Sequence, residues 1–375
     1  MNKLEEKRLR DLCSDISYGY TKRATYSKFG PKFLRITDIT SDYIDWETIP
    51  FCKISEEDFE KYRPQYNDIV ITRTGATSGY NQQFRENIDA VYALYLIRFR
   101  IDENKANLRC VYYYLQSSAY KGFVNNYISG AAQPGINATV LSKLKLSLPN
   151  KKTQHHIAGI LSEYDDLIKA NNRRIELLEQ TAQELYKEWF VRFRFPGYEN
   201  AKFEDEIPEG WECCRLGKIL SFGAGKTRPK SGETYPFYGG NGILDYCNNY
   251  NSENAIIIGR VGVFCGTVYY EPDKCWISDN ALFAESKNSM HFYNYCLPKN
   301  MNLNARQIGT GQPLITQDFL NKIRILLPVE SLMMKYNQIA SELLKQQDLL
   351  RKMNVNIAAQ RDILIHRLMS GKLEV

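Results

Sequence analysis

Apolar residues recur at helical spacing for about 40 residues after Pro149. Written as heptads, the pattern holds over five repeats, and Asn171 is the polar exception among the a and d positions. A 3.5-residue repeat of this length favours a helix packed on another helix over an ordinary core helix within a domain. We therefore predict a helix roughly 60 Å long, ended by Pro196-Gly197. Its half of the inter-helix seam consists of Ile157, Leu161, Ile168, Asn171, Ile175, Leu178 and Leu185.

The pattern returns 182 positions later and predicts a second long helix, ended by Gly371. Its a positions combine Ile339 and Met353 with Gln346 and Gln360. Because the two helices are copies of one another, we expect them to pack antiparallel, with a pseudo-two-fold axis across the pair. Its half of the seam consists of Leu343, Leu350, Ile357 and Leu364.

The remainder of the chain is also written twice. The segment from Ile69 to Gly75, followed by Gly79, recurs 187 positions later from Ile256 to Gly262, followed by Gly266. Five of these positions are identical, including the arginine at 73 and 260. Such a repeat predicts a duplicated domain, because each copy is far longer than a solenoid repeat.

Two further blocks support the duplication. Gln133-Pro134-x-Ile136 returns 179 positions later as Gln312-Pro313-x-Ile315, and the match continues to Pro149 and Pro328. A fainter block pairs the stretch 12–19 with 216–223, at an offset of 204. The matched ends enclose middles of different length, as expected where loops have diverged.

Short β-branched runs alternate with Gly, Asn and Ser clusters in each copy, which indicates strands and loops. We predict an α+β protein: two similar mixed α/β domains, separated by two long antiparallel helices that form a coiled coil with pseudo-two-fold symmetry. The predicted segments are 1–150 (first domain), 151–194 (first spacer helix), 195–212 (linker), 213–328 (second domain) and 329–375 (second spacer helix).

The net charge of +6 is unevenly distributed. Segments 1–150 and 213–328 each carry +4, whereas the linker 195–212 carries −5. Both domains are therefore mildly basic, which suits a polyanion. Two basic domains related by a two-fold axis match duplex DNA, whose grooves return every 34–36 Å or so. The pattern thus favours a protein that reads two half-sites, with helix length setting the gap between them.

Base recognition requires hydrogen-bonding side chains on exposed loops. The glycines at 75, 79, 262 and 266 would let the backbone approach DNA closely. Arg73 and Arg260 are the strongest candidates because the repeat keeps them, although they could equally hold a loop in place. The candidate DNA-contacting residues are Lys22, Arg23, Arg73, Thr74, Thr77, Ser78 and Gln133 in the first domain, and Lys226, Arg228, Lys230, Asn241, Arg260 and Gln312 in the second.

Over nearly its whole length the chain resembles the specificity (S) subunit of type I restriction–modification systems. The resemblance rests on Gly130–Ile136, the helix 154–161 leading to Leu185–Phe193, Ile207–Trp211, and the C-terminal stretches Gln360–Leu364 and Ser370–Leu373. It implies a DNA-binding subunit without catalytic activity that reads a bipartite double-stranded site. It also implies two methyltransferase (M) subunits, two restriction (R) subunits where the system includes them, and S-adenosylmethionine, Mg²⁺ and ATP on those partners only.

Other motifs suggest rival functions. Gly223–Thr227 resembles the end of a phosphate-binding loop but lacks its first glycine, since position 220 is Leu. Asp273, Glu285 and Lys287 resemble the core of a metal-dependent nuclease, without an equivalent in the first copy. A stand-alone two-headed DNA-binding regulator is the other alternative. A methyltransferase is disfavoured because neither its glycine-rich loop nor its Asn/Asp-Pro-Pro-aromatic motif is present.

The nine cysteines contain no C-x-x-C pair, and the four histidines form no helical metal pair, so we expect neither disulfides nor a metal site. No run of 18 apolar residues and no signal peptide is found, so we expect a cytoplasmic protein. An aromatic cluster at the end of the first helix, Trp189, Phe190 and Phe193, is a candidate docking patch for the methyltransferase subunits, unless it packs on the chain's own domains.

Overall fold

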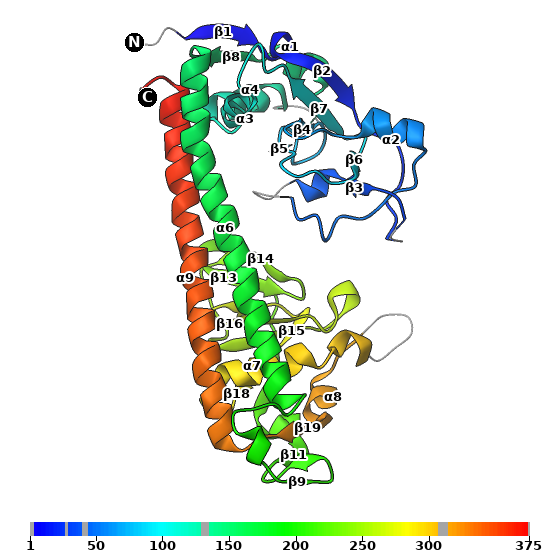
Figure 1. Cartoon of the computed structure of the whole chain (residues 1–375), viewed down its shortest axis with the longest axis vertical. Coiled ribbons are helices and arrows are strands. Elements are labelled where there is room, and N and C mark those ends of the chain that lie inside the picture. The colour runs from blue at the N-terminus through cyan, green and yellow to red at the C-terminus, as the bar shows by residue number, and fades with distance from the viewer. Residues whose placement is uncertain (1–3, 27–28, 40–43, 129–134, 307–313, 374–375) are drawn as a thin grey trace. The chain divides into compact units, whose positions relative to one another are not determined.

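The computed structural model describes residues 4–26, 29–39, 44–128, 135–306 and 314–373. The chain divides into two compact units (Figure 1): Met1–Ala170 with Met353–Val375, and Asn171–Lys352. Both boundaries fall inside the long helices, so each unit contains part of each helix. Within the described ranges, no helix is both long enough and apolar enough to cross a bilayer.

A four-stranded antiparallel sheet forms the centre of the first unit. Ile69 and Ile71 of its strand β4 belong to one core cluster, and Val70 belongs to another. This alternation follows from the two-residue period of a strand, and it explains why β4 is buried on both faces. In sheet order, the strands are β2 (Cys13–Tyr18), β7 (Leu96–Ile101), β4 (Ile69–Thr72) and β5 (Asn81–Gln83).

Smaller elements complete the first unit. Two pairs of strands lie outside the main sheet: β1 (Glu5–Arg8) with β8 (Lys145–Leu148), and β3 (Lys32–Leu34) with β6 (Ala90–Tyr92). The helices are α1 (Leu9–Leu12), η1 (Ile36–Asp38), α2 (Glu56–Tyr62), α3 (Leu108–Tyr114), α4 (Ser118–Ile128) and α5 (Ala138–Ser142).

The second unit repeats this arrangement. Its four-stranded antiparallel sheet has the order β12 (Leu220–Ala224), β18 (Ala281–Ser286), β15 (Ala255–Gly259) and β16 (Val268–Glu271). A second sheet has the order β14 (Gly242–Cys247), β13 (Ser231–Gly239) and β17 (Trp276–Ile277). The strand pairs are β9 (Phe203–Glu204) with β10 (Ile207–Pro208), and β11 (Glu212–Arg215) with β19 (Arg324–Leu327). The helices are α7 (His291–Asn300), α8 (Gln317–Lys322), η2 (Tyr198–Asn200), η3 (Leu216–Lys218), η4 (Gly262–Phe264) and η5 (Leu303–Arg306).

The strand registers correct one predicted alignment. Glu5 pairs with Leu148, and Glu212 pairs with Leu327. Since 148 and 327 are equivalent at the offset of 179, β1 and β11, which precede the faint block, correspond at an offset of 207. Within the block, Ile16 pairs with Phe99 and Phe222 pairs with Ala284, and these partners in turn pair with the repeated Ile69 and Ile256. Ile16 therefore corresponds to Phe222 at an offset of 206, and the predicted offset of 204 is wrong. The faint block was misaligned because a few Leu, Ser and Gly residues match at several offsets, whereas a backbone register allows only one.

Each domain passes into its long helix through a proline. The Asn150 side chain accepts a hydrogen bond from the backbone N–H of Thr153 (3.0 Å) and so caps α6 (Lys151–Phe190). The matching strand β19 ends one residue before Pro328, and α9 (Glu330–Met369) follows. The α6 helix ends at Phe190, earlier than the predicted Pro196-Gly197 stop.

Contacts within each unit show that α6 and α9 run antiparallel. In the first unit, the core contains Ile157 and Leu161 from the start of α6 and Ile365 from the end of α9. In the second unit, the hydroxyl of Tyr336, near the start of α9, donates to the carbonyl of Ala182, near the end of α6 (2.9 Å). The predicted fold class is therefore confirmed: two similar α/β domains and an antiparallel helix pair.

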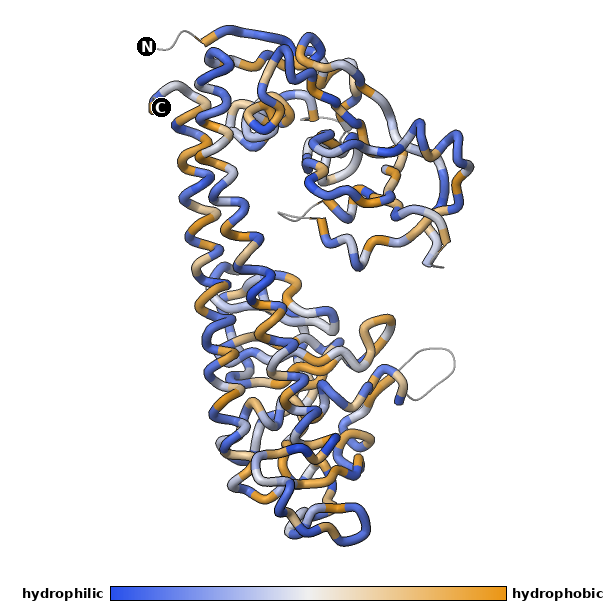
Figure 2. Tube along the Cα trace, in the orientation of Figure 1, coloured by the Kyte–Doolittle hydropathy of each residue, from blue (hydrophilic) through white to orange (hydrophobic). Residues whose placement is uncertain are grey.

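Polar and apolar residues alternate along both long helices (Figure 2). The predicted seam residues lie on the buried sides of these helices. Ile157, Leu161, Asn171 and Ile357 are fully buried. The others are partly buried: Ile168, Ile175, Leu178, Leu185, Leu343, Leu350 and Leu364.

The predicted a row of the second helix is wrong. Ile339 and Met353 are each 42% exposed, so they point away from the seam. The buried row lies one residue later and includes Ala340 and Gln347, which are 0% and 1% exposed. Apolar content misled the assignment because a glutamine occupies a buried position while an isoleucine and a methionine face outward.

Deletion of seam side chains tests the helix pairing. Leu161 is completely buried, whereas Leu167 on the same helix is 45% exposed. We expect Leu161→Ala to lower the free energy of unfolding by about 2–5 kcal/mol, because the first unit cannot refill the cavity. Leu167→Ala should change it by less than about 0.5 kcal/mol. Urea unfolding of both variants measures the difference, and equal effects would contradict the assigned helix faces.

Candidate nucleic-acid interface

The strongest repeat block folds into equivalent turns in the two units, here named turn A (residues 73–79) and turn B (residues 260–266). In turn A, the backbone N–H of Gly79 donates to the Thr72 carbonyl at 2.9 Å. In turn B, the N–H of Gly266 donates to the Gly259 carbonyl at 2.8 Å. Both glycines have φ near +90°, a conformation that other residues adopt only under strain. The repeat therefore preserves a backbone shape.

Arg73 and Arg260 lie at the base of these turns with equivalent backbone bonds. The N–H of Arg73 donates to Tyr95 (3.0 Å), and its carbonyl accepts from Ile136 (2.8 Å). The Arg260 backbone is held in the same way by Asn280 (3.1 Å) and Ile315 (3.0 Å). The two strongest repeat blocks of the sequence therefore meet in both units, at the backbone of the repeated arginine.

The two arginine side chains have different surroundings. The Arg73 guanidinium lies 5.0 Å from the ring centroid of Tyr18. The Nε atom of Arg260 is buried and has no hydrogen-bond partner among the described residues. A buried donor without a partner costs about 1–3 kcal/mol, so an acceptor brought to turn B would stabilise this side chain. The two arginines therefore share their backbone hydrogen bonds, whereas the contacts of their side chains differ.

The remaining first-unit candidates differ in accessibility. Lys22 and Arg23 are exposed, and they follow Tyr20, whose N–H donates to the Tyr92 carbonyl (2.7 Å). Thr74 and Thr77 in turn A are half-buried. Ser78 is only 5% exposed, and its hydroxyl donates to the Gly75 carbonyl (2.8 Å). Ser78 therefore shapes the turn and does not present its side chain at the surface.

In the second unit, three candidates lie around β17 and turn B. The N–H of Lys226 donates to the Ile277 carbonyl (2.9 Å), three residues before Asn280, which holds Arg260. Gly240, next to Asn241, packs closely on Gly259. Exposed Lys226 and Asn241 therefore lie beside Arg260 and form a polar surface around turn B.

Arg228 and Lys230 are both exposed. Arg228 forms an ion pair with Asp245, and its guanidinium lies 5.1 Å from the ring centroid of Phe237. Gln133 and Gln312 lie outside the described residues. Ile136 and Ile315, which follow them in the sequence, hydrogen-bond to turns A and B.

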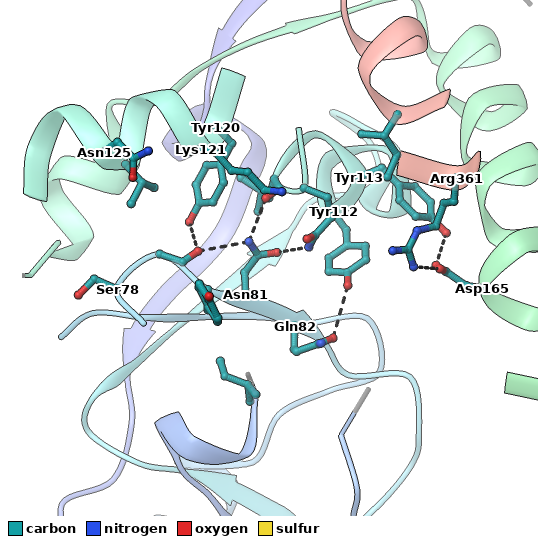
Figure 3. Close-up of a pocket in the computed structure, with 17 residues that line it drawn as sticks. Ser78, Asn81, Gln82, Tyr112, Tyr113, Tyr120, Lys121, Asn125, Asp165 and Arg361 are labelled. Atoms are coloured by element: carbon teal, nitrogen blue, oxygen red, sulfur yellow. Dashed lines mark hydrogen bonds and ion pairs between the residues drawn. The ribbon is translucent and has the colours of Figure 1, made fainter. Parts of the chain in front are cut away.

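A pocket of about 470 Å³ lies beneath turn A (Figure 3). On one side, the Tyr120 hydroxyl donates to the Gly79 carbonyl (2.7 Å), and the Asn81 amide donates to the Leu115 carbonyl (3.0 Å). On the other side lie Asp165 of α6 and Arg361 of α9. The pocket therefore lies between the residues that hold turn A in place and the two long helices.

Asp165 is the centre of a buried ionic network that the sequence analysis missed. Its carboxylate accepts from Arg85 (2.7 Å), Arg361 (2.7 Å) and the hydroxyl of Tyr113 (2.6 Å). Burial by itself would raise the pKa of Asp165, but these positive charges and hydrogen bonds lower it below its ordinary value. The network ties the first domain to both helices. The heptad pattern did not indicate it, because the predicted a row of the second helix contained Gln360 and left Arg361 outside the seam.

The rival motifs do not form the sites they resemble. Gly223–Thr227 runs from strand β12 into a loop that leads to β13, so no helix follows to bind a phosphate. Glu285 lies on β18, and Asp273 follows β16, with β15 between these strands. The two carboxylates therefore come from strands that are two spacings, roughly 10 Å, apart. Lys287 donates to the Gly217 carbonyl (2.6 Å). No group of three potential metal ligands occurs among the described residues.

The aromatic cluster at the end of α6 is not an exposed docking patch. Trp189 and Phe190 are 7% and 8% exposed and belong to the core of the second unit. Phe193 is half-buried, and its ring lies 5.3 Å from that of Trp211. Of the two alternatives for this cluster, the structure shows packing on the chain's own second domain and not an exposed docking patch.

Comparisons with known proteins agree with this architecture. A family model described as the type I restriction modification DNA specificity domain matches residues 1–180 and 208–354. The chain is 25% identical over 300 residues to the type I restriction enzyme MjaIX specificity subunit of Methanocaldococcus jannaschii, a match that covers 71% of this chain and 69% of that protein. A protein of the same organism with the provisional name of MjaX specificity subunit is 28% identical over 408 residues, with coverages of 99% and 94%.

The fold is similar to the crystal structure of a type I restriction–modification system S subunit from M. genitalium. The TM-score is 0.52 at 18% sequence identity, and the match covers 97% of this chain and 96% of that one. At this level of identity, the likeness shows the fold alone.

The ionic network predicts a pH-dependent stability. The pKa of Asp165 is lower in the folded protein than its unfolded value of about 3.9. Ionised Asp165 therefore stabilises the fold above the unfolded pKa, and this stabilisation is lost as the pH falls through the folded pKa. Asp165→Asn should cost roughly 2–4 kcal/mol at pH 7, because Arg85 and Arg361 lose their partner, and less below about pH 4.

Its exposed neighbour Asp166 supplies the control. Asp166→Asn should leave the free energy of unfolding nearly unchanged at every pH. Chemical denaturation between pH 3 and pH 8 measures all three proteins. A cost for Asp165→Asn that is independent of pH would rule out the ionic explanation.

Proposed function

The chain belongs to the type I restriction–modification DNA specificity family, and we propose on this premise that it selects a bipartite DNA site for a restriction–modification complex. Family members are non-catalytic subunits, and the enzyme activity resides in partner subunits. The observation that carries the proposal is the duplicated turn: two domains present the same backbone with different side chains. Two such surfaces can read two unlike half-sites.

The antiparallel helices support a fixed gap between the half-sites. Each helix has 40 residues, which corresponds to roughly 60 Å of continuous helix. A helix pair resists bending far better than a loop linker, so it can act as a spacer. We infer that the base pairs between the half-sites are not read and that their number is constant.

The partners are DNA and the methyltransferase and restriction subunits of the system. We propose that two methyltransferase subunits bind this chain and supply S-adenosylmethionine, and that restriction subunits, where present, supply the sites for Mg²⁺ and ATP. The complex would act in the cytoplasm, where the host DNA is found.

A groove on the helix pair is the surface that best fits a methyltransferase subunit. In the second unit, its lining includes Leu177 of α6 and Leu349 of α9, which are 44% and 59% exposed. Arg174, Thr181 and Gln346 form its polar part. An exposed apolar groove with a polar rim is typical of a protein-binding surface. It replaces the buried aromatic cluster as the proposed docking site.

The methylation pattern of host DNA tests the function. With its methyltransferase subunit co-expressed, we expect methylated adenines in a motif of two specified parts separated by a gap of constant length. Single-molecule sequencing of genomic DNA reveals the motif. A continuous palindrome, or metal-dependent cleavage by the isolated chain, would contradict the proposal. Tight, site-specific binding by the chain alone would favour a stand-alone regulator.

Substitutions in the groove test the docking site. Leu349→Glu places a charge in the apolar groove, and we expect it to weaken binding of the methyltransferase subunit at least tenfold. Val355→Glu is the matched control, because Val355 is 70% exposed on the same helix and does not line the groove. Co-purification and titration calorimetry measure binding. Equal loss in both variants would place the docking surface elsewhere.

A further inference from the structure

The tips of turns A and B carry chemically opposite side chains. Turn A has Ala76 and Thr77 between its glycines, whereas turn B has Val263 and Phe264 at the equivalent positions. Val263 is 92% exposed and Phe264 is 47% exposed. Since the two turns share their backbone hydrogen bonds, the difference lies in the side chains that they present. Turn B exposes an apolar tip where turn A offers a hydroxyl.

Turn B is held rigidly beneath this tip. A β-carbon at Gly266 would lie 2.5 Å from the backbone nitrogen of Asn304, and one at Gly259 would collide with the Phe264 carbonyl. The Thr267 hydroxyl also donates to the Gly240 carbonyl of the β13–β14 hairpin. The base of the turn is therefore closely packed on η5 and on the β13–β14 hairpin. A rigid base presents Val263 with little loss of conformational entropy on binding.

The groups around the apolar tip suit nucleic acid. Arg260 begins the turn, Asn241 lies on the adjoining hairpin, and the exposed Arg306 ends η5, which packs against Gly266. Arginine and asparagine contact phosphates and base edges. An apolar tip surrounded by such donors matches the major-groove edge of a base pair, where the thymine methyl group is the apolar feature.

We propose that turn B reads a thymine methyl group in the second half-site, with Val263 as the specificity-determining residue and Phe264 beside it. Turn A reads its half-site with polar groups, including the Thr77 hydroxyl. The inference rests on the proposed function and adds the chemical class of base edge that each turn recognises. It also explains why one repeated backbone can serve two dissimilar half-sites.

Replacement of thymine by deoxyuracil removes the methyl group and leaves base pairing intact. The experiment uses the chain in complex with its methyltransferase subunit and duplexes that contain the bipartite site. At one thymine of the second half-site, we expect deoxyuracil to raise the Kd about three- to tenfold, close to the contribution of one buried methyl group. In the variant Val263→Ala/Phe264→Thr, the same replacement should change the Kd by less than twofold.

Two controls separate this role from general damage. The same replacement in the first half-site should affect the wild type and the variant equally. Phe203→Thr changes an apolar side chain that is 46% exposed elsewhere in the second unit, and it should retain the full deoxyuracil effect.

The outcomes distinguish the two levels of the proposal. A bipartite motif whose second half-site lacks thymine, or tolerates deoxyuracil at every thymine, overturns the assignment of turn B alone. An undiminished deoxyuracil effect in the Val263→Ala/Phe264→Thr variant overturns it as well. Ile243 and Leu244 of the adjoining strand β14 are also exposed. If the apolar tip of turn B binds a protein subunit instead of DNA, the variant will lose subunit binding while its DNA preference stays unchanged. Absence of any bipartite motif refutes the proposed function itself.

Discussion

Burial of one stripe of each long helix is the interaction on which the architecture depends. The same residues that pair the helices also complete the domain cores: Ile157 and Leu161 in the first unit, and Tyr186 and Trp189 in the second. The helices are therefore part of both domain cores, because neither domain could bury its apolar face without them. A change in the seam thus affects the stability of the domain that it adjoins.

The ion pairs of Asp165 add a geometric constraint to this apolar packing. Hydrophobic contacts tolerate small rotations, whereas a carboxylate held by Arg85 and Arg361 accepts few geometries. The network joins the first domain to both helices at the pocket beneath turn A. The second unit uses the aromatic packing of Trp189 on Tyr336 at its helix pair instead. Duplicated halves have thus reached equivalent frameworks with different chemistry.

The predictions succeeded where the pattern was periodic or repeated. Heptads identified the two helices, and the two strongest repeat blocks proved to touch each other at Arg73 and Arg260. They failed where residue type was taken as a sign of position. Ser78 is polar but buried, and Trp189 and Phe190 belong to a domain core. Ile339 faces outward, whereas Gln347 lies in the seam. The type of a residue indicates only whether burial is favourable, because the neighbouring elements determine whether its side chain is covered.

Duplication, the two long helices, the repeated arginines and the family resemblance could all be predicted before any fold was known. All of these depend on spacing along the chain, which a linear pattern contains in full. The strand register of the faint repeat block, the Asp165 network and the exposure of the tip of turn B became evident only from the folded chain. Each of these depends on which distant segments meet, since the environment of a side chain is set by neighbours that the linear order does not specify.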